Sequence, residues 1–140
     1  MSIVQTQTTS FKAELYQGIH NLLTDTLKIA LYTANADLNE DTTAYTSTGE
    51  LPTANGYTQT GVVLTGVTIG ISGYTAFVSF NNVTWNPASF TARAALIYNS
   101  SKANRSIAVL DFGADKTATG TFVITLPANT ASSAIIRSSN

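Results

Sequence analysis

Residues 121–126 read Thr-Phe-Val-Ile-Thr-Leu and show the clearest alternation of polar and apolar side chains in the chain. Phe122, Ile124 and Leu126 fall on one face, with the remaining positions on the other. Successive side chains of a β-strand point to opposite faces of a sheet, so this period of two predicts a half-buried strand. Residues 27–32, Leu-Lys-Ile-Ala-Leu-Tyr, show the same period much earlier in the sequence. Strands are therefore expected from both parts of the chain.

Further strand-like segments lie between these two and beyond them, separated by residues that favour turns. The additional predicted strands are 62–69, 74–80, 92–98, 107–112 and 134–137. The turn signals are Ser72-Gly73, Asn81-Asn82, Asn86-Pro87, Asn99-Ser100 and 118–120. Short strands at close spacing with turns between them are typical of antiparallel sandwiches and barrels. We therefore predict a mainly β fold, either an antiparallel β-sandwich or a jelly-roll-like barrel.

One helix is expected near the N-terminus. Ser10 is a suitable N-cap, and it precedes apolar residues at helical spacing, namely Phe11, Leu15, Ile19 and either Leu22 or Leu23. Residues 1–9 are polar, rich in Thr and Gln, and lack a strong period. The sequence therefore predicts a flexible N-terminal arm over 1–9, followed by a single β-rich domain over 10–140 that opens with an N-terminal α-helix.

The segment 34–60 has few aliphatic residues and many turn formers, with one short strand expected near Tyr45. Irregular connections of this length are uncommon inside compact domains, and they are usually functional or ordered by a partner. Tyr45 and Tyr57 in this segment are accordingly candidate interface residues.

Phe77 is the third candidate interface residue. Tyr74, Ala76, Val78 and Phe80 share one face of a predicted strand, which leaves Phe77 on the other. Two interpretations stay open: the strand is buried on both sides, or Phe77 is an exposed anchor for a neighbouring protein.

The charge content argues against several function classes. Charged residues make up 11% of the chain, the net charge is −1, and the Lys and Arg residues are scattered. A nucleic-acid partner or an anionic membrane surface calls for a basic patch, so neither is expected. No apolar run reaches the length of about 20 residues that a membrane helix needs. A net charge near zero favours association, which suggests a homo-oligomer, either a trimer or a dimer.

The sequence contains no motif with an evident catalytic, cofactor-binding or metal-binding role. His20 is the only histidine, and a solvated or core-edge side chain is the simpler interpretation than a catalytic base. Asp37, Glu40 and Asp41 lie close together, but the glycine-centred acidic loop typical of calcium sites is absent from the sequence. The Asp111-Phe112-Gly113 triplet lacks the other kinase motifs. We expect a non-enzymatic protein with no catalytic residue, cofactor or metal.

A set of segments extends over about residues 10–130, namely 28–33, 42–46, 48–50, 56–58, 62–66, 95–99 and 108–113. Together these segments resemble a group of small virion structural proteins of tailed bacteriophages. The resemblance implies a virion component. Within that group the size favours capsid decoration, in which a cement protein binds the major capsid protein on the outer surface of the shell. The N-terminus lacks signal-peptide features, so synthesis in the host cytoplasm without export is expected.

Two other functions stay open at this point. A tail or fibre subunit would share the composition, since Thr-rich β domains are common there. A carbohydrate-binding β-sandwich module is the other alternative, with Tyr45 and Tyr57 as stacking platforms for sugars.

Overall fold

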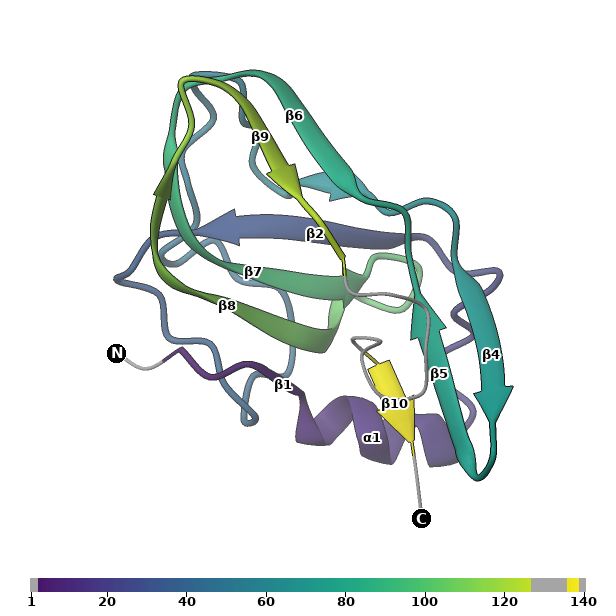
Figure 1. Cartoon of the computed structure of the whole chain (residues 1–140). Coiled ribbons are helices and arrows are strands. Elements are labelled where there is room, and N and C mark those ends of the chain that lie inside the picture. Colours follow the sequence, from purple (N-terminus) through teal and green to yellow (C-terminus); the bar gives the residue numbers. More distant parts are fainter. Residues whose placement is uncertain (1–2, 127–135, 139–140) are drawn as a thin grey trace.

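The computed structural model describes residues 3–126 and 136–138 of the chain (Figure 1). The elements in chain order are β1 (Thr6–Gln7), α1 (Thr9–Tyr16), β2 (Leu27–Tyr32), β3 (Val62–Val63), β4 (Thr68–Ser72), β5 (Thr75–Ser79), β6 (Val83–Ala88), β7 (Thr91–Asn99), β8 (Arg105–Thr117), β9 (Gly120–Ile124) and β10 (Ile136–Ser138). The prediction of a mainly β fold with one short helix near the N-terminus is confirmed.

All strand pairs are antiparallel, and they form three sheets. The largest has the strand order β1-β8-β7-β2-β3, the second has the order β10-β5-β4, and the third is the β6–β9 pair. Figure 1 shows β6 and β9 arching over one side of the large sheet, while the β4–β5 hairpin extends along the other end of the molecule. The arrangement is compatible with the predicted β-sandwich.

One face of the large sheet packs against the β6–β9 pair. Ile29 and Leu31 of β2 are fully buried on this face and belong to the same apolar core as Trp85 and Phe122. The rings of Trp85 and Phe122 meet edge to face with centroids 5.9 Å apart, a favoured aromatic geometry. Phe122 is therefore on the inner face of β9, as its alternation with polar neighbours predicts.

The opposite face of the same sheet is buried as well. Ala30 and Tyr32 of β2 are fully buried there, although the alternation alone suggested a half-buried strand. Ala36 and Leu38 from the connection after β2 cover them and are also fully buried. The long irregular segment is therefore the second covering layer of the sheet, which is why it holds a fixed shape within this chain.

The helix starts earlier and ends sooner than predicted. The N-cap is Thr8, whose Oγ1 accepts a hydrogen bond from the Phe11 N–H at 3.4 Å, so Ser10 lies inside the helix. The helix ends at Tyr16, because Gly18 adopts the left-handed conformation (φ +70°) that terminates many helices. Leu22 is buried in the turn that follows, so the predicted apolar stripe is shared between helix and turn.

Residues 3–9, which the sequence predicts as part of a flexible arm, lie against the large sheet in the structure. Thr6 and Gln7 pair with Val109 and Ala108 at the edge of β8, and the Val4 N–H donates to the Leu38 carbonyl at 2.9 Å. Backbone groups at an open sheet edge need hydrogen-bond partners. The polar N-terminal segment provides them, which is why it docks as an edge strand.

Other element boundaries in the structure also differ from the predicted ones. The predicted strand 62–69 is divided into β3 and β4, with Gly66 between them at φ +66°. The predicted strand 107–112 extends over Arg105–Thr117. The predicted turn at Asn86-Pro87 lies inside β6, where the register with β9 shifts. Of the predicted strand 134–137, the first two residues lie outside the described residues.

Within residues 3–126 and 136–138, no helix is long and apolar enough to cross a membrane.

Truncation of Phe11 tests the docking of α1. Phe11 is fully buried, whereas the neighbouring Lys12 is exposed. We expect Phe11→Ala to lower the free energy of unfolding by about 3–5 kcal/mol, the usual cost of removing a buried aromatic ring. Lys12→Ala is the matched control and should change it by less than about 0.5 kcal/mol. Chemical denaturation monitored by circular dichroism measures both values, and equal midpoints for the two variants would contradict the docking.

Candidate functional site

Tyr45 and Tyr57 come together around one buried carboxylate. The Tyr45 hydroxyl donates to Glu50 Oε1 and the Tyr57 hydroxyl donates to Glu50 Oε2, each at 2.5 Å. The Thr60 N–H donates to Oε2 at 2.8 Å. Glu50 is 7% exposed. Its negative charge is thus held by two hydroxyls and one backbone N–H, which is the kind of compensation that a buried carboxylate needs.

The same cluster fastens the covering segment to the sheet. The Tyr57 hydroxyl also accepts a hydrogen bond from the Leu31 N–H of β2 at 3.0 Å. Tyr98 of β7 donates to the Thr60 carbonyl at 2.5 Å, and Tyr32 of β2 donates to the Thr46 carbonyl at 2.6 Å. Three tyrosine hydroxyls, those of Tyr32, Tyr57 and Tyr98, therefore link the segment after β2 to the two central strands.

Burial raises the pKa of the four tyrosines in this cluster. Loss of solvation is the largest cause for each, and the nearby Glu50 charge raises the pKa further because it opposes a second negative charge. The pKa of Tyr98 is raised to about 12, while those of Tyr32, Tyr45 and Tyr57 lie higher still. These hydroxyls are thus protonated donors over the whole ordinary pH range.

Tyr45 and Tyr57, the candidate interface residues from the sequence, do not form an exposed platform in this structure. Tyr57 is 2% exposed. Tyr45 is half-buried, with its ring 4.9 Å from the ring of Tyr98. Both hydroxyls point inward at Glu50. Glu50 is the residue of this cluster that sequence reasoning missed. Nothing in the sequence indicates that its carboxylate turns toward the core.

Phe77 is buried rather than an exposed anchor. It is 7% exposed, and its ring lies against Gly70 in β4, where a Cβ atom would come within 2.6 Å of the ring. Val78 on the other face of β5 is also buried, at 8% exposure. Of the two interpretations left open, burial on both sides is therefore correct for this part of β5.

The exposed apolar side chains of this hairpin are different ones, and sequence reasoning missed them. Ile69 and Ile71 of β4 are 46% and 79% exposed, and Tyr74 in the turn is 88% exposed. One sequence signal does mark the region: no Asp, Glu, Lys, Arg or His occurs between Glu50 and Arg93. The β4–β5 hairpin thus presents apolar groups with no charged side chain of its own. Interface cores are depleted of charge in this way.

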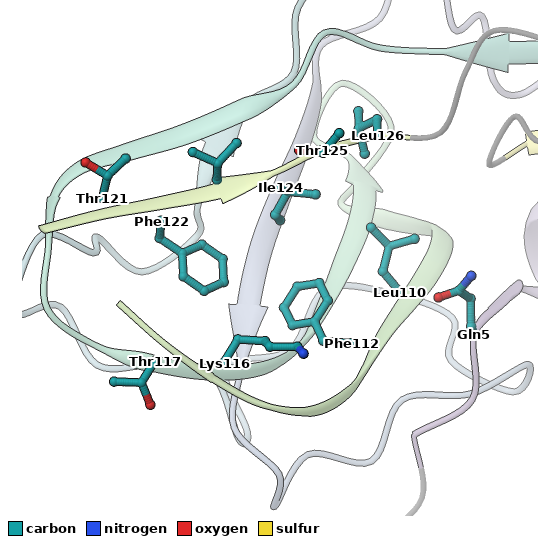
Figure 2. A pocket seen from close by; sticks show the side chains of 11 residues that line it. Gln5, Leu110, Phe112, Lys116, Thr117, Thr121, Phe122, Ile124, Thr125 and Leu126 are labelled. Atoms are coloured by element: carbon teal, nitrogen blue, oxygen red, sulfur yellow. The ribbon is translucent and has the colours of Figure 1, made fainter. Parts of the chain in front are cut away.

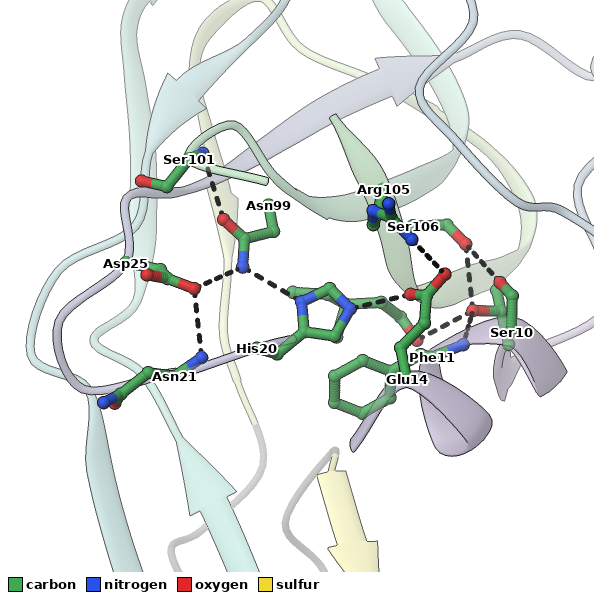
Figure 3. Close-up of polar contacts among 12 residues, drawn as sticks. Ser10, Phe11, Glu14, His20, Asn21, Asp25, Asn99, Ser101, Arg105 and Ser106 are labelled. Carbon is green, nitrogen blue, oxygen red and sulfur yellow. Dashed lines mark hydrogen bonds and ion pairs between the residues drawn. The ribbon is translucent and has the colours of Figure 1, made fainter. Parts of the chain in front are cut away.

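His20 lies inside a continuous polar network (Figure 3). Asn99 Nδ2 donates to His20 Nδ1 at 3.0 Å and to Asp25 Oδ2 at 2.8 Å, while Asn99 Oδ1 accepts from the Ser101 N–H. This fixes the orientation of the Asn99 amide, so Nδ1 of the imidazole is an acceptor. The proton of the neutral ring is then on Nε2, which donates to Glu14 Oε1 at 2.8 Å.

The network joins the helical region to the β7–β8 hairpin. Arg105 Nη1 at the start of β8 donates to Glu14 Oε2 at 3.1 Å, and Lys102 Nζ lies 3.5 Å from Asp25 Oδ1. Both nitrogens of His20 are engaged, and its side chain is fully buried. The arrangement accounts for the histidine as a structural link, which is the core-edge role considered from sequence.

A cleft of about 470 Å³ opens between β8 and β9 (Figure 2). Leu110 and Phe112 from β8 face Phe122 and Ile124 from β9 across it, with Lys116 at one side. Its lining is mixed, because polar side chains from the two strands stand beside these apolar ones.

The acidic residues considered as a cation site are placed in the covering segment. Asp37 Oδ1 accepts a hydrogen bond from Asn39 Nδ2 at 3.1 Å, and Glu40 and Asp41 are exposed. In the described part of the chain, no group of three or more His, Asp or Glu side chains is arranged to hold a metal ion.

Models of known protein families, curated proteins and solved structures were compared with this chain. None of them matches it. By its exposed apolar side chains, the β4–β5 hairpin is the feature that best fits contact with another protein.

Replacement of Glu50 tests the tyrosine cluster. Glu50→Gln places an amide NH₂ where the carboxylate accepted hydrogen bonds, so at least one buried hydroxyl loses its acceptor. We expect the free energy of unfolding to fall by about 1–3 kcal/mol. Glu40→Gln removes the same charge from an exposed position and should have little effect. Similar denaturation midpoints for these two variants would contradict the proposed role of Glu50.

Alkaline titration provides a second test. Tyrosines of the unfolded chain release their protons near pH 10, whereas the four clustered tyrosines hold theirs to higher pH. The folded state then binds more protons, so stability is complete below about pH 10 and falls as the pH rises toward 12. A variant with Tyr16 and Tyr74 changed to Phe restricts the phenolate absorbance to this cluster. The absorbance should increase only as the protein unfolds. Ionisation near pH 10 with the fold intact would refute the argument.

Proposed function

We propose that this chain is a non-enzymatic virion structural protein that binds an assembled phage capsid and stabilises it as a decoration protein. The observation that carries the protein-binding part is the β4–β5 hairpin, where Ile71 and Tyr74 are 79% and 88% exposed within a stretch free of charged residues. Exposed apolar groups gathered on one element are typical of protein contact sites. The capsid as the partner is supported by the sequence resemblance.

The inner polar groups support a structural role. Glu50 and His20 are buried ionisable groups, and the side chains of both are engaged in hydrogen bonds within the protein. A catalytic group has to reach a substrate at an accessible position. Here the buried carboxylate and the imidazole hold segments together, which is what a rigid attachment module requires.

The large sheet provides that rigidity because it is covered on both faces. A rigid module loses little conformational freedom when it binds, so less of its interaction energy is lost to ordering. Several copies held together on a capsid would gain further affinity through effective concentration. This is the basis for proposing a homo-oligomer that spans neighbouring subunits of the major capsid protein, with the tail or fibre subunit as the competing assignment.

Addition of purified protein to heads that lack it tests the function. We expect saturable binding, with heads releasing their DNA at a higher temperature once they are coated. Binding to the assembled state only, at a hundredfold excess over Kd, stabilises it by about 2.7 kcal/mol per site. Dye-detected DNA release and quantitative co-sedimentation measure the two effects. Heads that are equally robust with and without the protein would refute decoration, and labelled protein located on tails would favour the competing assignment.

The tip of the hairpin is the expected contact. Tyr74→Ala should weaken head binding by about tenfold or more, the size of effect that exposed tyrosine anchors give. Tyr16→Ala removes an equally exposed ring from the end of α1, at 93% exposure, and is the matched control. Equal affinities of the two variants, measured by co-sedimentation, would show that the hairpin tip is not the contact.

A further inference from the structure

The outer edge of β4 is open. β5 lies between β10 and β4, so among the described residues no strand pairs with the other side of β4. Natural edge strands are normally protected against pairing by a charged residue, a proline or a bulge. The strand reads Thr-Ile-Gly-Ile-Ser over Thr68–Ser72, pairs with β5 in unbroken register, and contains none of these protections.

The hairpin geometry shows which backbone N–H and C=O groups of β4 are available to pair with another strand. Ser72 and Thr75 flank a two-residue turn, and Gly73 provides the positive φ (+57°) that such turns need at their first central position. The pair that closes a two-residue turn is hydrogen-bonded, and bonded pairs alternate along an antiparallel ladder. Gly70 is therefore bonded to β5, while the N–H and C=O groups of Ile69 and Ile71 point to the open edge.

The strand is also close to a palindrome about Gly70. Reversal of its direction exchanges Ile69 with Ile71 and Thr68 with the similar residue Ser72. An antiparallel copy of the same strand therefore matches it residue for residue.

We propose that two copies of the chain pair antiparallel through their β4 edges, about a two-fold axis at Gly70. Ile69 of one copy then lies opposite Ile71 of the other, and each of the two pairs exchanges two backbone hydrogen bonds. Residues opposite each other in a ladder share a face, so the four isoleucines form one apolar cluster. Gly70 meets its own counterpart in the close, non-bonded position, where the absence of a side chain permits the approach.

The surrounding surface favours this partner. Ile69 and Ile71 are 46% and 79% exposed in one copy, so pairing removes a large apolar area from water. No charged side chain lies on either strand of the hairpin, and the net charge of the chain is −1. Repulsion between two copies at this edge is therefore small. The two-fold arrangement joins both three-stranded sheets into one continuous sheet.

The biological role of this dimer rests on the proposed decoration function. The dimer itself is tested in solution without any capsid. A dimer that fails to bind heads would reject the capsid assignment alone. A monomer that still binds heads would reject the dimer alone.

The first experiment measures mass in solution by sedimentation velocity at tens of micromolar. We expect the full chain to be a dimer. Ile71→Lys places a charge at the edge of each copy and should raise the dimer dissociation constant by at least about tenfold. Val123→Lys adds the same charge to β9, where Val123 is 50% exposed, and should leave the dimer intact. A monomeric parent protein, or a dimer that persists unchanged in Ile71→Lys, would overturn the proposal.

The second experiment tests the register by crosslinking. The chain contains no cysteine, so introduced pairs have no background. In the proposed register Thr68 of one copy lies opposite Ser72 of the other in a close, non-bonded pair with a Cα separation of about 4.5 Å, within disulfide range. The double variant Thr68→Cys/Ser72→Cys should form a covalent dimer under mild oxidation, whereas each single variant should not. Circular dichroism confirms that the variants are folded. Crosslinking by either single variant alone, or by none of the three, would refute the register.

Discussion

The carboxylate of Glu50 is the point on which the architecture depends. It is buried, and its donors are two tyrosine hydroxyls and one backbone N–H. A buried charge is costly unless its acceptor sites are occupied, so the segment that carries these donors has to be in place for the fold to be stable. Tyr57 extends the same network to the Leu31 N–H of β2. The carboxylate thereby couples the covering segment to the sheet beneath it.

Close backbone packing reinforces this coupling. At Gly61 a Cβ atom would lie 1.8 Å from the Ile29 carbonyl oxygen, so only a glycine, here at φ +82°, lets the chain return this close to β2. With the segment fixed in this way, Tyr32 and Leu38 lose all contact with water. The large sheet becomes a scaffold buried on both faces, and few of its own apolar side chains are left for contact with other proteins.

Exposed apolar groups are consequently displaced to the periphery, above all to the β4–β5 hairpin. In Figure 1 this hairpin lies at the opposite end of the molecule from the β6–β9 arch. Val78 joins the main apolar core and Phe77 is covered on the opposite face of β5, while Ile71 and Tyr74 are the most exposed apolar residues of the hairpin. The two proposals overlap at Ile71: the capsid proposal relies on Ile71 together with Tyr74 in the turn, and the dimer proposal relies on the β4 edge. A rigid body with its contacts on one projecting element is suited to repeated attachment on a regular surface.

The sequence by itself determined the period of the elements: strands over 27–32 and 121–126, an N-terminal helix, and antiparallel pairing through short turns. Those properties depend on neighbours within a few residues. The tertiary structure alone decided which side chains face water. Phe77 is covered and Ile71 is not, although both are apolar strand residues, because the Phe77 ring lies against Gly70 whereas the Ile71 side chain is 79% exposed. The Tyr57 side chain points inward because its hydroxyl donates a hydrogen bond to Glu50. Residues 3–9 lie along β8 because that strand, about a hundred residues away in the sequence, has an open edge with backbone groups to pair. Contacts between segments that are distant in the sequence leave no pattern in the residues around them. They are therefore visible only in the folded structure.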